Sequence, residues 1–297
     1  MKNISIVLVL CSTMLFAQGA GENGLTFLKL SYGAKNAALA DLGVVYSKDA
    51  TALFYNPALL ADDDINLSIS HNQSIQDLRS QNLAFGFNYD KIKFAIGVNT
   101  ASIDEIEVRN VPGDPIAKFN ANYFFGSIST GFYVSDEISV GTTFKYLYEG
   151  LYSDEATGYG FDFGIAYNNL IPNLNLGLSL RNLGSMNKLR NVETELPKDF
   201  RFGASYNLKF EEIKSDVVLL AGINKYLSED ELCSAFAADI IYDNLFSIRI
   251  GYLTGIEARS FSAGFGVLWN NFKVDYAFIP FKYDLGSSNI ITVGYNF

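Results

Sequence analysis

The stretch Ser288-Asn-Ile-Ile-Thr-Val-Gly-Tyr-Asn-Phe297 closes the chain and decides its fold class. Apolar or aromatic residues at positions 291, 293, 295 and 297 alternate with Thr, Gly and Asn at 292, 294 and 296. Successive side chains of a β-strand point to opposite faces, so this segment has one apolar and one polar face. A strand that closes a barrel in an outer membrane needs this pattern, because lipid lies outside and water or packed polar groups lie inside.

The first twenty residues predict export. Lys2 precedes an apolar run over residues 4–16, and small residues follow at 17–20. The run is too short for a stable membrane-spanning helix, which needs about 20 residues. We therefore predict a cleaved signal peptide over residues 1–20, with a retained anchor as the alternative. Terminal Phe297, with Tyr295 on the same face, resembles an outer-membrane assembly signal, so we expect the outer membrane of a Gram-negative bacterium.

Composition narrows the functional classes. The 297-residue chain has a net charge of −10 and a pI of about 4.6, and no basic patch occurs, so we expect no nucleic-acid partner. His71 is the single histidine, which excludes metal clusters based on histidine. Ser-His nucleophilic catalysis could use only His71, and nothing in the spacing around it specifies a catalytic set. We predict no catalytic residues, no enzyme activity, no metal and no cofactor.

Period-two patterning fills residues 65–297 and predicts an all-β fold. We expect a transmembrane antiparallel β-barrel of about fourteen strands over this range, because the strand lengths suit tilted crossings of a bilayer. Very tight turns near 90–91, 135–136, 243–244 and 270–271 alternate with longer links near 103–119, 150–156, 184–197, 227–232 and 281–287. A soluble β-sandwich or propeller is the alternative, and it would need more charge on its polar face.

Residues 21–64 differ from the rest and are predicted to form a short helical plug, or hatch, inside the barrel. The alanine-rich segment 32–42 predicts one short helix. Residues 47–60 predict a second helix, or two turns broken at Pro57. Pro57 keeps Asn56 out of a helix, and the Asn56 side chain can cap backbone amides.

The polar face of the strands carries charges that are expected to point into the lumen. Two cross-strand pairings follow from the turns: Asp239 opposite Arg249, and Lys145 facing Asp162. A charge inside a barrel must be paired or hydrated, so we interpret the set as ion pairs that brace the wall and the plug, with a polar conduit or ligand site as the alternative. The predicted lumen charges are Lys145, Asp162, Arg181, Arg201, Asp239, Arg249, Lys273 and Asp275.

Two segments of the plug resemble a known family. Residues 27–43 and the stretch Asp49-Ala-Thr-Ala-Leu-Phe-Tyr-Asn-Pro-Ala58 resemble the opening of the PorV/PorQ family of Bacteroidetes-type bacteria. The chain departs from many members at Ala40-Asp41, where they have a Gly-Gly pair. The family looks like a branch of the FadL-like fourteen-stranded barrels, which carry an Asn-Pro-Ala element in an N-terminal hatch. The resemblance implies that Asp49, Asn56, Pro57 and Ala58 form the hatch motif.

The resemblance implies two different functions. PorV and PorQ members act in type IX secretion or surface attachment by binding cargo or partner proteins, and we expect this function first. The alternative is FadL-like transport of long-chain fatty acids or other hydrophobic small molecules. Expected partners are outer-membrane lipids, with secretion-system or cargo proteins, or a hydrophobic ligand in the alternative case. The candidate contact surfaces are the links 103–119 and 184–197, with apolar residues Ile103, Ile106, Val108, Val111 and Pro112.

Overall fold

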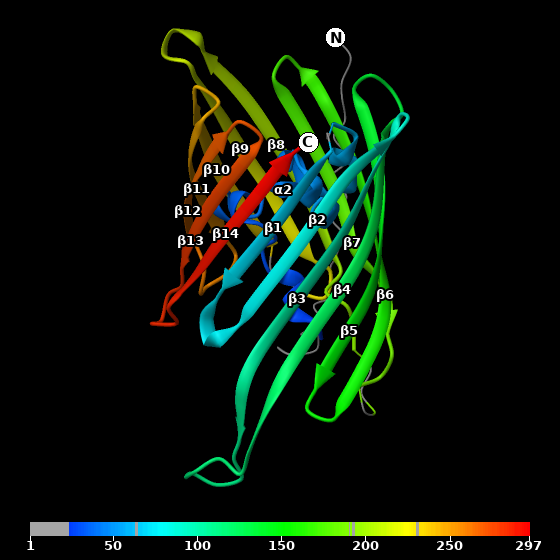
Figure 1. Ribbon diagram of the computed structural model, residues 1–297, viewed down its shortest axis with the longest axis vertical. Coiled ribbons are helices and arrows are strands. Elements are labelled where there is room, and N and C mark those ends of the chain that lie inside the picture. The colour runs from blue at the N-terminus through cyan, green and yellow to red at the C-terminus, as the bar shows by residue number, and fades with distance from the viewer. Residues whose placement is uncertain (1–23, 63–64, 190, 192–193, 230–231) are drawn as a thin grey trace, which may run out of the picture.

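The computed structural model describes residues 24–62, 65–189, 191, 194–229 and 232–297. It is a closed barrel of fourteen antiparallel strands, in which each strand pairs with its neighbours in sequence and β1 pairs with β14 (Figure 1). The predicted all-β barrel of about fourteen strands is confirmed. The predicted signal peptide, residues 1–20, lies outside the described residues.

The strands follow one another around the barrel in chain order. They are β1 (Asn66–Gln73), β2 (Arg79–Tyr89), β3 (Ile92–Val108), β4 (Ala117–Tyr133), β5 (Ile138–Leu151), β6 (Asp154–Ile171), β7 (Leu174–Met186), β8 (Asp199–Phe210), β9 (Ser215–Tyr226), β10 (Leu232–Tyr242), β11 (Phe246–Thr254), β12 (Phe261–Trp269), β13 (Phe272–Pro280) and β14 (Ser287–Asn296). Two further 3₁₀ turns, η4 (Ile75–Asp77) and η5 (Glu211–Ile213), lie in the links.

The two faces of the wall differ as the alternation predicts. On β14, Ile291 and Val293 are about half exposed on the outside, whereas Thr292 between them is buried and bonds to Ser70 of β1. A continuous band of exposed apolar side chains around a barrel is what lipid covers, so the outer face indicates a membrane-embedded wall. The same pattern holds on two other strands, for Tyr159, Phe161, Phe163 and Ile165 of β6 and for Phe246, Ile248, Ile250 and Tyr252 of β11.

The two ends of the barrel have different connections. The end with the links 74–78, 109–116, 187–198, 255–260 and 281–286 is here called the loop end, and the opposite end, with the tight turns and the C-terminus, is called the turn end. The β3–β4 hairpin extends farther from the barrel than any neighbouring strand at the loop end (Figure 1). The wall is therefore taller on this side.

Two predicted long links are shorter than expected. The link predicted at 150–156 is wrong, because only Tyr152 and Ser153 join β5 to β6. The link predicted at 103–119 shrinks to 109–116, and its first apolar residues belong to β3. The reason is a bulge, since Glu105 has φ 57° and the β3–β4 register shifts between Ile103 and Ile106. Beyond an inserted residue, side chains that pointed outward at even positions point outward at odd positions, or the reverse. Alternation therefore breaks at the bulge, and the strand beyond it is missed in the sequence.

Residues 24–62 fill the lumen as a chain of short helical turns, the plug. The helix predicted over 32–42 ends early, because Ala40 and Asp41 both take left-handed backbone angles, with φ 52° and 60°. None of the helices among the described residues is long and apolar enough to cross a membrane. The plug elements are η1 (Thr26–Lys29), α1 (Ala34–Ala38), α2 (Gly43–Tyr46), η2 (Ala50–Phe54) and η3 (Pro57–Asp62).

Candidate functional site

The plug runs lengthwise through the lumen. At the loop end, the amide of Gly24 donates to the carbonyl of Glu195 at 3.2 Å. At the turn end, the Asn168 side chain donates to the carboxylate of Asp62 at 3.2 Å, and the Tyr133 hydroxyl donates to the same carboxylate. A solute that crosses the barrel must therefore pass the plug.

Aligned glycines bring the wall close to the plug. Gly131, Gly141 and Gly164 face one another across β4, β5 and β6. A Cβ atom at Gly131 would lie 2.5 Å from the carbonyl oxygen of Pro57, and one at Gly141 or Gly164 would overlap Pro57 or Asn56. Only glycine leaves room for the backbone of the plug at these positions. We call these three residues the glycine seat.

A second glycine row continues the contact. Gly177, Gly203 and Gly222 are aligned across β7, β8 and β9. A Cβ atom at Gly203 would lie 2.8 Å from a methyl group of Val44, and one at Gly222 would lie 2.6 Å from a methyl group of Leu42. The sequence showed glycine on the inward parity, but it could not show that the glycines of different strands align under the plug.

The hatch-motif residues lie where the plug meets the wall or turns. Asn56 is fully buried, and its side-chain amide donates to the carbonyls of Val44 at 2.7 Å and Ile165 at 3.2 Å. The Asn56 side-chain oxygen accepts from the amide of Ala58 at 3.1 Å, which is the predicted backbone cap. Asp49 accepts in the same way from the amide of Thr51 at 3.1 Å. The motif thus joins two plug segments and one strand.

All eight charges predicted for the lumen lie inside the barrel, and each has an opposite charge within 4 Å. The one lumen charge of this set that is only half-buried is Lys273. The pairs are Lys145–Asp162 at 2.7 Å, Arg181–Asp199 at 2.5 Å, Arg201–Asp199 at 3.1 Å, Arg249–Asp239 at 3.2 Å, Arg249–Asp275 at 2.6 Å and Lys273–Asp275 at 3.3 Å.

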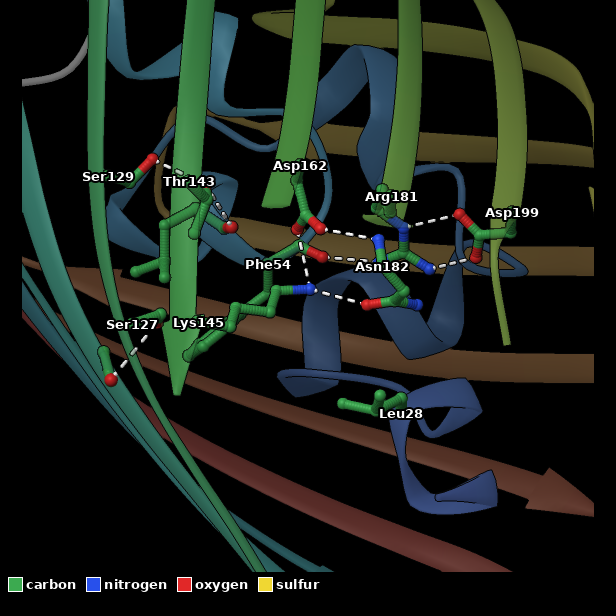
Figure 2. Close-up of polar contacts among 12 residues, drawn as sticks. Leu28, Phe54, Ser127, Ser129, Thr143, Lys145, Asp162, Arg181, Asn182 and Asp199 are labelled. Atoms are coloured by element: carbon green, nitrogen blue, oxygen red, sulfur yellow. Dashed lines mark hydrogen bonds and ion pairs between the residues drawn. The ribbon is translucent and has the colours of Figure 1, made fainter. Parts of the chain in front are cut away.

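Asp199 is the hub of the first charge network, and Figure 2 shows its two bonds with Arg181. Arg181 donates two hydrogen bonds to its carboxylate, at 2.8 and 2.5 Å, and Arg201 donates two more, at 3.2 and 3.1 Å. Arg181 also donates to the carbonyl of Phe54 at 2.5 Å, and Arg201 reaches the carbonyl of Asp41 at 3.5 Å. One buried carboxylate therefore orients two arginines that hold two different parts of the plug.

A β-bulge adjoins this hub. Asn182 has φ 58°, and the β6–β7 register shifts between Phe161 and Phe163. The backbone amide of Asn182 donates to Asp162 at 2.8 Å, and Lys145 donates to the Asn182 side chain at 2.8 Å. The predicted Lys145–Asp162 contact forms diagonally, because the register places Gly160 opposite Lys145.

The second network lies on the opposite wall. The prediction that Asp239 lies opposite Arg249 is confirmed by the β10–β11 register. Arg249 bridges Asp239 and Asp275, while Lys273 bridges Asp275 and Asp49 of the plug, at 3.3 Å each. Removing one partner of such a buried pair leaves an uncompensated charge, which typically costs about 3–5 kcal/mol.

Two plug residues beside this network have shifted pKa values. Burial lowers the pKa of Lys35 to about 7, with the Lys273 charge as the second cause. The Lys35 ammonium lies 3.9 Å from the centre of the Tyr46 ring, a contact that favours the charged form and opposes the shift. Burial would raise the pKa of Asp49, but the charges of Lys273 and Lys35 outweigh it and hold that pKa below its usual value.

An apolar hollow of about 560 Å³ opens at the loop end. It lies between the β3–β4 hairpin, the β5–β6 turn and the link after β7. Leu189 connects the hollow to the interior, because it also packs against the buried apolar cluster that contains Phe27 of the plug. The lining residues are Val108, Ile116, Ala117, Phe119, Leu151, Tyr152, Asp154, Leu189 and Thr194.

A polar hollow of about 330 Å³ lies at the turn end. Asn168, Asn175 and Asn207 line it together with Lys48 and Asp62. A smaller cavity of about 40 Å³, enough for a few water molecules, is lined by plug residues 40–42 and 44 and by residues of β8–β11. The lumen thus passes from an apolar mouth, through a packed plug, to a polar exit.

The backbone at Ala40-Asp41, where many members of the resembled family have a Gly-Gly pair, is of the kind that glycine favours. Both residues lie in the left-handed region, which glycine occupies freely and alanine does not. Asp41 pairs with Arg259 at 2.8 Å and accepts from Ser31 at 3.0 Å. The sequence marks Asp41 only as a departure from the resembled family and does not point to Arg259 or Asp199, since the contacts of all three depend on register and on the path of the plug.

The C-terminal aromatics form a small cluster at the turn end. The ring of Tyr295 lies 4.9 Å from that of Phe297 and 4.8 Å from that of Phe272. Phe297 also contacts Phe85 across the β1–β14 seam, at 6.2 Å between ring centres. Aromatic rings at a barrel rim suit the membrane interface. Their use as an assembly signal stays a prediction.

No protein-family model matches this chain, and no curated protein matches it either. The expected kinship with PorV and PorQ therefore receives no support. Several solved structures do share the fold. The Pseudomonas putida toluene transporter TodX is similar, with 13% identity, coverage of 89% of this chain and 96% of that chain, and a TM-score of 0.62.

Two more solved structures give the same result. A TodX mutant, described as a monoaromatic hydrocarbon channel, has 13% identity, covers 90% of this chain and 99% of its own length, and gives a TM-score of 0.64. A Pseudomonas aeruginosa FadL homologue has 12% identity, with coverage of 89% of this chain and 98% of that chain, and a TM-score of 0.54. At these identities the likeness shows the fold, and it extends over nearly the full length of these channels.

Proposed function

We propose that this chain is an outer-membrane channel that admits hydrophobic small molecules through the loop end. The observation that carries the proposal is the apolar hollow, whose lining residue Leu189 packs against the apolar cluster around the plug. A barrel that only braced its wall would not need an apolar hollow of about 560 Å³ at its mouth. The hydrocarbon channels that share the fold support the same choice.

The expected order of the two functions is therefore reversed. The sequence favours protein secretion first, because the inward face of the strands is polar and Gly-rich rather than apolar, with the links 103–119 and 184–197 as candidate contact surfaces. The structure gives Ile103, Ile106 and Val108 to strand β3, and only Val111 and Pro112 stay in the loop. Two observations support the transport alternative: the apolar hollow at the loop end and the hydrocarbon channels that share the fold.

The η1 turn belongs to the buried apolar cluster against which Leu189 of the hollow packs. Phe27 stacks on Tyr123 at 5.1 Å between ring centres, and Leu25 and Leu28 are almost fully buried beside it. Passage therefore requires η1 to shift, and the Asn-Pro-Ala turn on the glycine seat holds the rest of the plug in place. Altering Asn56 should disturb passage without changing the hollow.

Uptake of radiolabelled toluene tests the proposal. The chain would be expressed in a Gram-negative strain that lacks its own hydrophobic-uptake channels. We expect uptake above that of an empty-vector strain, and a loss of most of the gain in the Ile116→Ser/Phe119→Ala double variant. Val111→Ser, at the exposed tip of the same hairpin, is the matched control, since Val111 does not line the hollow. Equal uptake in all strains, with secretion proteins that copurify with the barrel, would overturn the proposal.

A further inference from the structure

Glu149 on β5 is a buried carboxylate, and one of its two oxygens lacks a hydrogen-bond partner among the described residues. Its side chain is 6% exposed, and the oxygen without a partner is Oε2. Each of the eight lumen charges named above has an oppositely charged partner, whereas Glu149 forms no ion pair with any described residue. A buried carboxylate oxygen without a partner is costly, and it requires a donor that this part of the chain does not supply.

Glu149 lies beneath the lining of the apolar hollow, one pleat farther into the barrel than Leu151. It precedes Leu151, which lines the hollow, by two residues on the same face of β5. Two residues along a strand span about 6.6 Å, which is one pleat farther into the barrel. Its register partners are Tyr123 on β4 and Ala156 on β6, neither of which carries a positive charge.

The walls of the hollow favour an organic cation. The rings of Phe119 and Tyr152 meet edge to face, 5.6 Å apart, and both line the hollow. Aromatic faces attract ammonium groups, and more strongly when water is excluded. Ile116 and Leu189 add aliphatic surface for the apolar part of a ligand.

The rim of the hollow is acidic. A cleft lined by one sign of charge concentrates ligands of the opposite sign. Three acidic residues near the mouth are held in ion pairs: Glu105 with Lys118 at 2.8 Å, Glu107 with Arg109 at 2.5 Å and Asp104 with Arg79 at 3.8 Å. In residues 102–119, 152–155 and the described part of 187–198, the other acidic residues are Asp114, Asp154, Glu155 and Glu195, and the other basic residues are Lys188 and Lys198. Acidic residues therefore outnumber basic ones around the mouth.

We infer that the loop-end hollow binds hydrophobic molecules that carry a protonated amine. The ammonium group pairs with the Glu149 carboxylate, and the apolar part packs on Phe119, Tyr152 and Ile116. This inference rests on the proposed function and deepens it, because it names an amphipathic cation as the preferred ligand over a neutral hydrocarbon or a carboxylate.

Calorimetry with three matched probes tests the inference. The full chain in nanodiscs of zwitterionic lipid would be titrated with 2-phenylethylamine, with the neutral 2-phenylethanol and with the anion 3-phenylpropionate. We expect the amine to bind about tenfold more tightly than the alcohol, as for a hydrogen bond to a charged group, and the anion to bind most weakly. In Glu149→Gln the amine and the alcohol should bind within about twofold of each other.

The controls separate the two proposals. Glu212→Gln changes an exposed carboxylate at the turn end, away from the hollow, and should keep the preference for the amine. Glu149→Asp keeps the charge and serves if Glu149→Gln does not fold. Equal binding of the amine and the alcohol by the wild type would overturn this inference alone. Failure of all three probes to bind, or an alcohol affinity that Phe119→Ala leaves unchanged, would overturn the proposed function as well.

Discussion

The plug meets the two sides of the barrel by two different kinds of contact. Toward β3–β7, the packed side, Tyr32 and Phe54 stack with ring centres 4.8 Å apart, and both meet Phe125 of the wall within 6 Å. Toward β8–β14, the charged side, a smaller apolar cluster around Tyr46 and Leu220 is supplemented by ion pairs between plug and wall, Asp41–Arg259 and Asp49–Lys273.

The difference separates what fixes the plug from what could release it. Apolar packing and close backbone contact do not respond to ionic strength, and they fail only when their shape is changed. Ion pairs respond to the protonation and to the loss of one partner. We therefore expect the packed side to define the position of the plug and the charged side to set how firmly it is held.

The largest expected effect comes from Asp199, because this hub serves both sides. Asp199→Asn should lower the free energy of unfolding by about 3–5 kcal/mol, since Arg181 and Arg201 then lie buried without a carboxylate. Urea unfolding in lipid vesicles measures the change. Adding Arg181→Met should recover part of the loss, whereas exposed Glu212→Gln should stay within about 0.5 kcal/mol of the wild type. If Asp199→Asn loses no more stability than Glu212→Gln, the role of Asp199 as the hub of the network is refuted.

The glycine seat tests the packed side. Gly141→Ala places a Cβ atom against Pro57, so the plug must move, and we expect a loss of about 1–3 kcal/mol. Conductance in planar bilayers should rise at the same time. Gly126→Ala is the matched control, because the nearest atom to its Cβ would be a flexible ring carbon of Phe124 at 3.6 Å. Unchanged conductance in Gly141→Ala would show that the seat does not position the plug.

The pH dependence of stability tests the charged side. The folded pKa of Lys35, about 7, lies below its unfolded value, so the unfolded chain binds more protons between about pH 7 and 10.5. Stability from this group therefore rises with pH across that window. The urea midpoint of the wild type should increase from pH 7 to pH 10, and the increase should be smaller in Lys35→Met. Identical pH profiles would mean that the ammonium is not destabilised by burial.

Ala40→Gly is expected to have the smallest effect, and its sign is opposite. Ala40 lies in the left-handed region with φ 52°, and glycine relieves that strain while it adds flexibility to the unfolded chain. The net gain should be about 0.5 kcal/mol in the urea midpoint experiment. Asp41→Gly should instead destabilise the protein, because it removes the ion pair with Arg259. A loss of stability in Ala40→Gly would contradict the strain argument.

Much of the barrel wall could be predicted from the sequence, because the alternation of apolar and polar residues along a strand shows which face points to lipid. Alternation at positions such as 291–295 and 159–167 gave both the strand and its lipid face. The prediction of strand bounds failed where the alternation of apolar and polar residues was interrupted. The bulges at Glu105 and Asn182 each insert a residue. Because of the bulge at Glu105, alternation did not predict the loop-end part of the β3–β4 hairpin as strand.

The sequence by itself determined the alternating faces, the strand number, the tight turns and the inward direction of the charges, because these depend on neighbours within a few residues. Only the tertiary structure decided which glycines align under Pro57, that Asp199 joins two arginines, and that Glu149, below an apolar hollow, has one carboxylate oxygen without a partner among the described residues. Those features depend on the register between strands and on the path of the plug. Both are settled by closure of the whole barrel, which no local stretch of sequence encodes.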